Sequence, residues 1–220
     1  MTEKQPKNAL FTRIWMSALG VLVCGVSVGL FKAVELGVDP FQSLMSGLNA
    51  VIPIRFGTLY VIVNVILLLF SLIFDRSKIG LATVINLTLL GYVADFSKGL
   101  TLQLLGQMSL VGRLVLLAVA IVVMCFGSAL YFNANLGVST YDAVSLVIAE
   151  RQKKVPFKWC RILSDLVCVI LAAVLLRCAG RSWQEITADI GIATIITAFF
   201  MGPLISAFSK LLPNPTGRVF

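Results

Sequence analysis

Six stretches of the chain are almost continuously apolar, and the polar residues gather between them. A helix needs about 20 mostly apolar residues to cross the hydrocarbon core of a bilayer. Lipid offers no partner for free backbone groups, so continuous runs predict helices, whereas a β-barrel would need short alternating segments. The predicted spans are Phe11–Lys32, Thr58–Phe74, Ile79–Phe96, Leu114–Phe132, Trp159–Leu176 and Ile186–Phe208.

Two further apolar segments, Pro40–Pro53 and Ser139–Ala149, fall short of a full span. They fit re-entrant, interfacial or tilted helices. The pattern therefore predicts an all-α polytopic membrane protein with about six transmembrane helices and two short re-entrant or broken helices.

Three blocks of sequence recur in the same order, which indicates an internal duplication. The triplet Leu36-Gly37-Val38 returns a hundred positions later as Leu136-Gly137-Val138. The stretch IGLATVINLTLLGYV, from Ile79, is matched by IGIATIITAFFMGPL, from Ile190. We therefore predict one membrane domain made of two homologous repeats, residues 13–110 and 111–210. A cytoplasmic tail of residues 1–12 precedes them, and a tail of residues 211–220 follows.

The orientation of the repeats depends on the two short helices. If they do not cross the membrane, each half crosses three times and the second half is inverted, as in many transporters. If they cross, each half crosses four times and the repeat is parallel. Basic residues do not decide between the models, because the two models place nearly equal numbers of Lys and Arg in the cytoplasm. Both models place the termini and the loop Arg151–Lys158 there. We prefer six crossings because Ser139–Ala149 is short.

Composition supports a membrane protein and argues against an enzyme. Hydrophobic residues make up 59% of the chain and charged residues 13%, against about 25% charged in soluble domains. The mean hydropathy is +0.98. The net charge of +8 is better explained by basic cytoplasmic loops than by nucleic-acid binding. The chain has no histidine and no nucleotide, zinc or hydrolase motif, so no catalytic residue, metal or cofactor is predicted.

The repeated turns are the strongest candidates for a site. Gly37 would break the helix, Asp39 would cap the next one, and Gln42 has the capping-box spacing. In the second copy Gly137, Ser139 and Asp142 take these places. Helix N-terminal ends carry free N–H groups and partial positive charge, so two of them near the midplane would form a polar site. The alternative is that both are ordinary caps at the membrane interface.

Asn64 and Asp165 occupy similar places in the spans that follow the turns. A carboxylate within a span is costly and is functional by default. The alternative is a structural pair between Asp165 and Arg161, one helical turn earlier. We expect the two turns to meet near the middle of the protein and form its principal polar cavity. The predicted substrate-binding residues are Gly37, Asp39, Gln42, Asn64, Asn135, Gly137, Ser139, Tyr141, Asp142 and Asp165.

The repeated LGV-x-P-F-x-x-L segment, the PFKW–RILSD stretch and the closing IGIAT…MGP segment resemble the YczE/YitT family of bacterial inner-membrane proteins. The resemblance is closest to the YczE branch and covers nearly the whole chain. It implies a multi-pass protein of the bacterial inner (cytoplasmic) membrane and suggests a transporter. The chain departs from the family pattern at Gln42, where an acid is frequent.

Together these features favour a secondary carrier or exporter of an unidentified small organic solute that is neutral, zwitterionic or cationic. We expect the lipid bilayer and the solute as partners, with H⁺ or Na⁺ as a coupling ion and a homo-oligomer as an option, and no nucleic acid. Two alternatives stay open. One is a channel or pore, and the other is a non-transporting membrane factor that binds a lipid or a partner protein.

Overall fold

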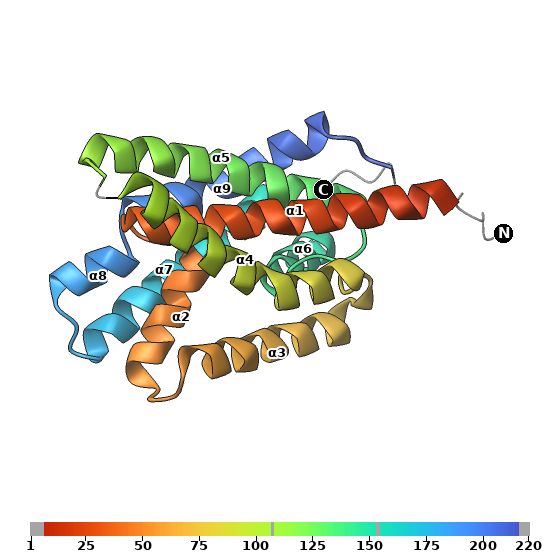
Figure 1. The fold of residues 1–220 in the computed structure, drawn as a ribbon. Coiled ribbons are helices and arrows are strands. Elements are labelled where there is room, and N and C mark those ends of the chain that lie inside the picture. The colour runs from red at the N-terminus through yellow and green to blue at the C-terminus, as the bar shows by residue number, and fades with distance from the viewer. Residues whose placement is uncertain (1–6, 107, 153–154, 216–220) are drawn as a thin grey trace.

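The computed structural model describes residues 7–106, 108–152 and 155–215, and every regular element in these ranges is helical (Figure 1). One short 3₁₀ helix, η1 (Arg76–Lys78), precedes α4. The α-helices are α1 (Lys7–Val34), α2 (Pro40–Val51), α3 (Phe56–Phe74), α4 (Leu81–Leu105), α5 (Leu110–Ala134), α6 (Thr140–Gln152), α7 (Phe157–Cys178), α8 (Trp183–Asp189) and α9 (Ile192–Leu211).

The helices α1 and α5 form the antiparallel pair at the centre of the fold (Figure 1). Arg13, near the start of α1, donates from Nε to the carbonyl of Ala134 at 2.7 Å, at the end of α5. In the opposite sense Arg113, near the start of α5, lies 3.7 Å from Glu35, just beyond the end of α1. A cation beside a helix C-terminus is favourable, because the free carbonyls there carry partial negative charge. Each helix thus places an arginine at the end of the other.

The start of α1, the start of α4 and the end of α9 lie at one end of the molecule. Arg13 also donates to the carbonyl of Asn135 at 2.5 Å, and the next residue, Leu136, accepts from the Ala82 N–H at 2.9 Å. Asn133 donates from Nδ2 to the carbonyl of Ser209 at 2.8 Å. The link between α4 and α5 lies at the opposite end, where Arg113 meets Glu35.

The two repeated turns have the same backbone shape. Gly37 and Gly137 have φ of 99° and 101°, and Glu35 and Asn135 have φ of 52° and 50°. Glycine adopts positive φ without the steric cost that a side chain brings, which explains its place at the centre of both turns. The duplicated sequence therefore produces a duplicated local structure.

Each turn is bound to the start of the last long helix of the other half. The Ala193 N–H donates to the Leu36 carbonyl at 2.9 Å, as the Ala82 N–H does to Leu136. Thr194 Oγ1 donates to the Val38 carbonyl at 2.6 Å, and Thr83 Oγ1 donates to the Val138 carbonyl at 2.7 Å. These contacts cross between the halves, so each half supplies the hydrogen-bond donors that hold the turn of the other.

The predicted spans agree with the helices in kind, but not in every boundary. Four segments are long and apolar enough to cross a membrane, with a shorter apolar helix at Thr58–Phe74; the four are Leu10–Val34, Leu110–Ala134, Phe157–Cys178 and Trp183–Leu211. The helix α4 has the length of a span but does not join this group, and it extends to Leu105, well past the predicted end at Phe96.

The predicted span Ile186–Phe208 falls within the candidate span Trp183–Leu211, but it is not one continuous helix, because the chain breaks at Ile190 and Gly191 between α8 and α9. Gly191 has extended backbone, and its N–H donates to Thr194 Oγ1 at 3.3 Å, which caps α9. The break also lets the Leu36-Gly37 turn dock on the start of α9. Pro203 lies inside α9 without ending it.

The predicted tails are only partly described. The helix α1 begins at Lys7, inside the predicted tail of residues 1–12, while residues 1–6 lie outside the described part of the chain. At the other end α9 stops at Leu211, and residues 216–220 lie outside it. In the predicted loop Arg151–Lys158, residues 153 and 154 are also outside it.

Candidate functional site

A polar cavity lies beside the middle of α1 and α5, where the first turns of α2 and α6 approach each other. Its volume is about 80 Å³. The lining residues are Cys24, Val28, Asp39, Phe41, Gln42, Tyr60, Asn64, Asn86, Leu90, Met124, Ser128, Tyr131, Ser139, Thr140, Tyr141, Asp142, Arg161 and Met201. Both halves of the chain therefore contribute to one cavity.

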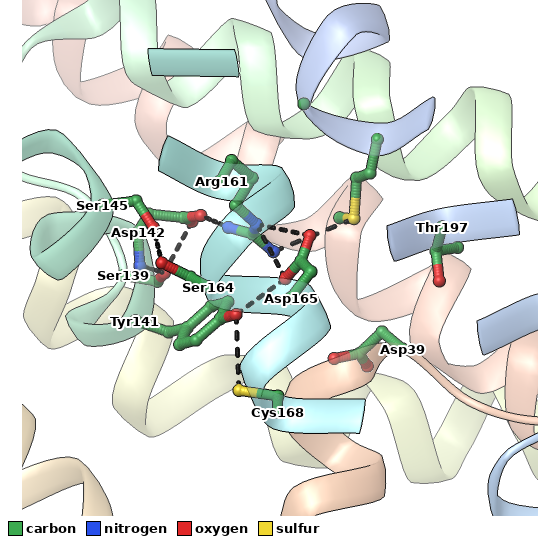
Figure 2. A network of polar contacts seen from close by, with 12 residues as sticks. Asp39, Ser139, Tyr141, Asp142, Ser145, Arg161, Ser164, Asp165, Cys168 and Thr197 are labelled. Carbon is green, nitrogen blue, oxygen red and sulfur yellow. Dashed lines mark hydrogen bonds and ion pairs between the residues drawn. The ribbon is translucent and has the colours of Figure 1, made fainter. Parts of the chain in front are cut away.

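Arg161 of α7 is the centre of a buried ionic cluster (Figure 2). Its Nε lies 3.2 and 3.1 Å from the two carboxylate oxygens of Asp165, and its terminal nitrogen forms an ion pair with Asp142 of α6. Arg161 is 4% exposed and Asp165 is fully buried. Charges this deeply buried persist only when they are paired and hydrogen-bonded. The cluster thus fixes α6 against α7, and the Arg161–Asp165 pair considered from the sequence is present.

Asp142 has several further partners. Its Oδ2 accepts from Tyr131 Oη at 2.5 Å and from Ser139 Oγ at 2.6 Å. The Asp142 N–H in turn donates to Ser139 Oγ at 3.0 Å, so Ser139 caps α6 as predicted. One carboxylate therefore joins the cap of a broken helix, the central helix α5 and Arg161.

Tyr141 connects the cluster to the first half of the chain. Its hydroxyl donates to Asp165 Oδ1 at 2.7 Å, and the Arg161 guanidinium lies 4.5 Å from its ring centroid (Figure 2). Its ring stacks on Phe41 of α2 with centroids 5.0 Å apart. Cation–π and stacking contacts favour a fixed ring orientation. The first turns of α2 and α6 meet through this ring pair.

Asp39 is the third carboxylate of this region, and it differs from the other two. It caps α2, with Oδ1 accepting from the Gln42 N–H at 3.2 Å. It lines the cavity and is only partly buried. Among the ion pairs of the described residues none involves Asp39, and Figure 2 draws no dashed line between Asp39 and the cluster.

The polar residue of α3, Asn64, bonds across to the second half. Its Oδ1 accepts from Thr140 Oγ1 at 2.6 Å, and its Nδ2 donates to the Tyr60 carbonyl at 2.8 Å. Asn64 is 5% exposed. It therefore attaches α3 to the start of α6 by a neutral hydrogen bond. Asp165, at the repeat position in α7, forms an ion pair instead.

Six of the ten predicted site residues line the cavity, namely Asp39, Gln42, Asn64, Ser139, Tyr141 and Asp142. Asp165 lies behind it, bound to Arg161 and Tyr141. The other three, Gly37, Asn135 and Gly137, are not in the lining.

The expectation that the two turns meet is wrong for the glycines themselves. A Cβ on Gly37 would collide with the backbone of Gly191, and one on Gly137 would collide with Gly80. Asn135 ends α5 in a left-handed conformation, and its carbonyl accepts from Arg13. The glycines therefore dock on the opposite half, while the helix starts that follow them face the common cavity.

Several lining residues were not predicted from the sequence, chiefly Arg161, Tyr131, Tyr60 and Asn86. Arg161 was considered only as the partner of Asp165. Tyr60 precedes Asn64 by four residues, as Arg161 precedes Asp165, so the repeat itself contained a signal for both. Nothing in the linear pattern separates Tyr131 from the other aromatic residues. In the described part of the chain, no group of three His, Cys, Asp or Glu side chains could hold a metal ion.

Long apolar helices, outward-facing apolar side chains and a polar cluster in the interior define a helical membrane protein. A family model described as "Family of unknown function (DUF6198)" matches residues 11–210, and the chain belongs to this family.

Two relatives from Bacillus subtilis (strain 168) match most of the chain. "Uncharacterized protein YyaS" is 24% identical over 194 residues, which cover 88% of this chain and 90% of the relative. "Uncharacterized membrane protein YczE" is 24% identical over 195 residues, which cover 89% and 83%. The resemblance to YczE is thereby confirmed. No solved structure matches the chain.

Proposed function

We propose that this protein is a secondary carrier or exporter of a small organic solute in the bacterial inner membrane, and that the solute binds in the cavity between α2 and α6. One observation carries the proposal. Two interrupted helices from different halves begin at the same polar cavity, beside the middle of the two central helices. Transporter sites are typically built in this way, from broken helices at the interface of two repeats.

The proposed topology has six crossings and an inverted repeat, with the halves at residues 13–110 and 111–210. Two features support it. The helices α1 and α5 are antiparallel, and the turns make equivalent contacts in opposite directions. The end of the molecule that holds Arg13 also holds the start of α4 and, beside α3, Arg151 over the Phe74 ring. The positive-inside rule assigns this end to the cytoplasm.

Close packing of α7 on α9 beside the cavity favours a carrier over an open pore. A Cβ on Gly202 of α9 would lie 3.0 Å from the Lys158 carbonyl and 3.3 Å from Arg161 Cβ. Met201 Sδ lies 3.9 Å from an Arg161 nitrogen. A channel would need a continuous path, whereas a carrier needs a site that is closed on one side at a time. A gradient of H⁺ or Na⁺ would supply the driving force.

Flux through purified protein in proteoliposomes tests this function. An untargeted comparison of the metabolites in overexpressing and deletion strains would supply the candidate solutes. Saturable flux that follows an ion gradient is the expected result. Flux that does not saturate would instead favour a pore. Absence of flux for every candidate, with a protein or lipid co-purifying in fixed ratio, would favour a non-transporting factor.

Cysteine labelling of intact cells tests the topology. Ser77→Cys, in the link before α4, should be protected from a membrane-impermeant maleimide, and Gln103→Cys, near the end of α4, should be labelled. Both positions are exposed, and the exposed Cys178 would first be replaced by Ser. Labelling of Ser77→Cys with protection of Gln103→Cys would contradict six crossings with a cytoplasmic N-terminus.

A further inference from the structure

The charges around the cavity do not balance among the described residues. Three carboxylates, those of Asp39, Asp142 and Asp165, surround one guanidinium, that of Arg161. Asp142 and Asp165 both pair with Arg161, which leaves Asp39 facing the cavity without a cation within ion-pair distance in the described chain. An unpaired carboxylate at membrane depth is costly, so the Asp39 carboxyl group is neutralised either by a proton or by a cation that binds in its place.

An anionic ligand finds no free counter-charge in the same cavity. The guanidinium of Arg161 is engaged by two carboxylates. The N-terminal ends of α2 and α6 could attract an anion, but Asp39 caps one and Ser139, bonded to Asp142, caps the other. This arrangement also disfavours a zwitterion, because its carboxylate would lie among carboxylates.

The walls near Asp39 are aromatic. Phe41 follows two residues later on the first turn of α2, with the Tyr60 ring edge-on at 6.0 Å and the Tyr141 ring stacked at 5.0 Å. Aromatic faces attract cations and also accept apolar groups. The Arg161 guanidinium lies over the Tyr141 ring and Phe41 stacks on the same ring, so Tyr141 holds Phe41 in place while Phe41 and Tyr60 supply the aromatic surface near Asp39.

We propose that the cavity binds a monovalent organic cation, a protonated amine or a quaternary ammonium ion with a small apolar body, with Asp39 as its counter-charge and Phe41 and Tyr60 against its carbon groups. This inference rests on the proposed carrier function and narrows its solute to one class. It assigns different roles to the carboxylates: Asp39 binds the solute, while Asp142 and Asp165 hold Arg161 in place.

Binding of two probe cations to the purified full-length protein tests the inference directly. Tetramethylammonium and choline are titrated in sodium-free potassium buffer, with the thermal midpoint of the protein as readout. The uncharged isostere of choline, in which carbon replaces nitrogen, and acetate serve as controls. Both cations should raise the midpoint saturably, and neither control should do so.

The matched variants are Asp39→Asn and Asp95→Asn. Asn still caps a helix, so Asp39→Asn should fold while weakening cation binding by about tenfold or more. Asp95 is an exposed carboxylate on α4, paired with Lys32 at 3.4 Å outside the cavity, and its replacement should leave binding unchanged. Asp39→Ser, which reproduces the cap found at Ser139, provides a second variant if Asp39→Asn is unstable.

Several results would overturn the proposal that the cavity binds an organic cation at Asp39. These are equal binding of the uncharged isostere, undiminished cation binding by both Asp39 variants, no midpoint shift with either probe, or a shift with Na⁺ alone. Other results distinguish a failure of the proposed carrier function from a failure of this inference. Saturable flux of a neutral or anionic solute, without choline binding, would keep the carrier and reject this solute class. Choline binding that requires Asp39, with no flux of choline, would support the site and count against the carrier.

Discussion

The two halves of this chain repeat the same elements, yet they pack differently at the cavity. In the second half α7 packs along α9, with Gly202 close to the Lys158 carbonyl. The corresponding helices of the first half, α3 and α4, make no comparable packing in the described chain, and α3 stands apart in Figure 1. Gly91 occupies the repeat position of Gly202, and a Cβ added there would have no atom of the described chain within 4 Å.

The difference between the halves follows the difference in charge. In the second half Arg161 ties α7 to α6 through Asp142 and contacts Met201 of α9. The corresponding residue of α3 is Tyr60, and α3 is attached to α6 by the neutral bond between Thr140 and Asn64. A carrier needs one group of helices that stays packed while another group moves relative to it. For the proposed carrier we therefore expect a second state in which α3 closes on α4 near Gly91.

The largest expected effect is that of removing the charge that distinguishes the halves. Arg161→Leu leaves Asp142 and Asp165 buried without a cation, which should lower the free energy of unfolding by about 3–5 kcal/mol. Tyr60→Leu, the same change at the repeat position, should cost less, because it removes a neutral hydroxyl beside Asn64 rather than the cation of a buried ionic cluster. Thermal unfolding of both purified variants measures the contrast. Equal losses would show that the ionic cluster does not distinguish the halves.

Substitutions at Gly202 and at its repeat position, Gly91, test the difference in helix packing between the halves. Gly202→Leu introduces a side chain against α7 and should destabilise the protein by about 1–3 kcal/mol through overpacking. Gly91→Leu should leave stability unchanged, since its surroundings are open, but should slow solute flux if α3 must approach α4. Thermal midpoints and proteoliposome flux are measured on both. Wild-type flux in Gly91→Leu would contradict closure at this position.

Asp142→Asn should reduce transport more than it reduces stability, because Asp142 positions Arg161, which lines the proposed solute site. Arg161 keeps its pair with Asp165, and Ser139 remains the cap of α6, so the loss should be about 1–2 kcal/mol from weakened hydrogen bonds. Gln42→Ala, at the repeat position in α2, should change stability less. Expression level, thermal midpoint and flux of the two variants are compared. Loss of folding in Asp142→Asn, with flux unaffected in the folded fraction, would give this residue a purely structural role.

The smallest effect concerns contacts that the two halves share. Thr83→Val and Thr194→Val each remove the hydrogen bond to the opposite turn, at Val138 and Val38, together with the weaker capping bond from the N–H of Gly80 or Gly191. Each should cost about 1 kcal/mol, and the two losses should be equal within error. Unequal losses in the thermal midpoint would show that the turns, despite their matching shape, are held with different strength.

The sequence alone determined the features that depend on local structure. Apolar runs predicted helices because backbone groups in lipid must bond within their own segment. The two LGV turns predicted broken helices because Gly37 and Gly137 take positive φ and Asp39 and Ser139 are good caps, and the structure has both turns and both caps. The same local signals identified six residues of the cavity lining.

Only the tertiary structure decided which distant residues share the site. Arg161 could have paired with Asp165 alone, but the packing of α6 on α7 brings Asp142 to it as well. The two LGV turns were expected to meet, but their glycines dock on the starts of α4 and α9 in the opposite half. The physical reason is that lipid and protein interior are similarly apolar, so a membrane helix carries little record in its sequence of which face turns inward. Packing between helices decides which face turns inward. It therefore also decides which residues pair with Arg161 and that Asp39 faces the cavity without a cationic partner.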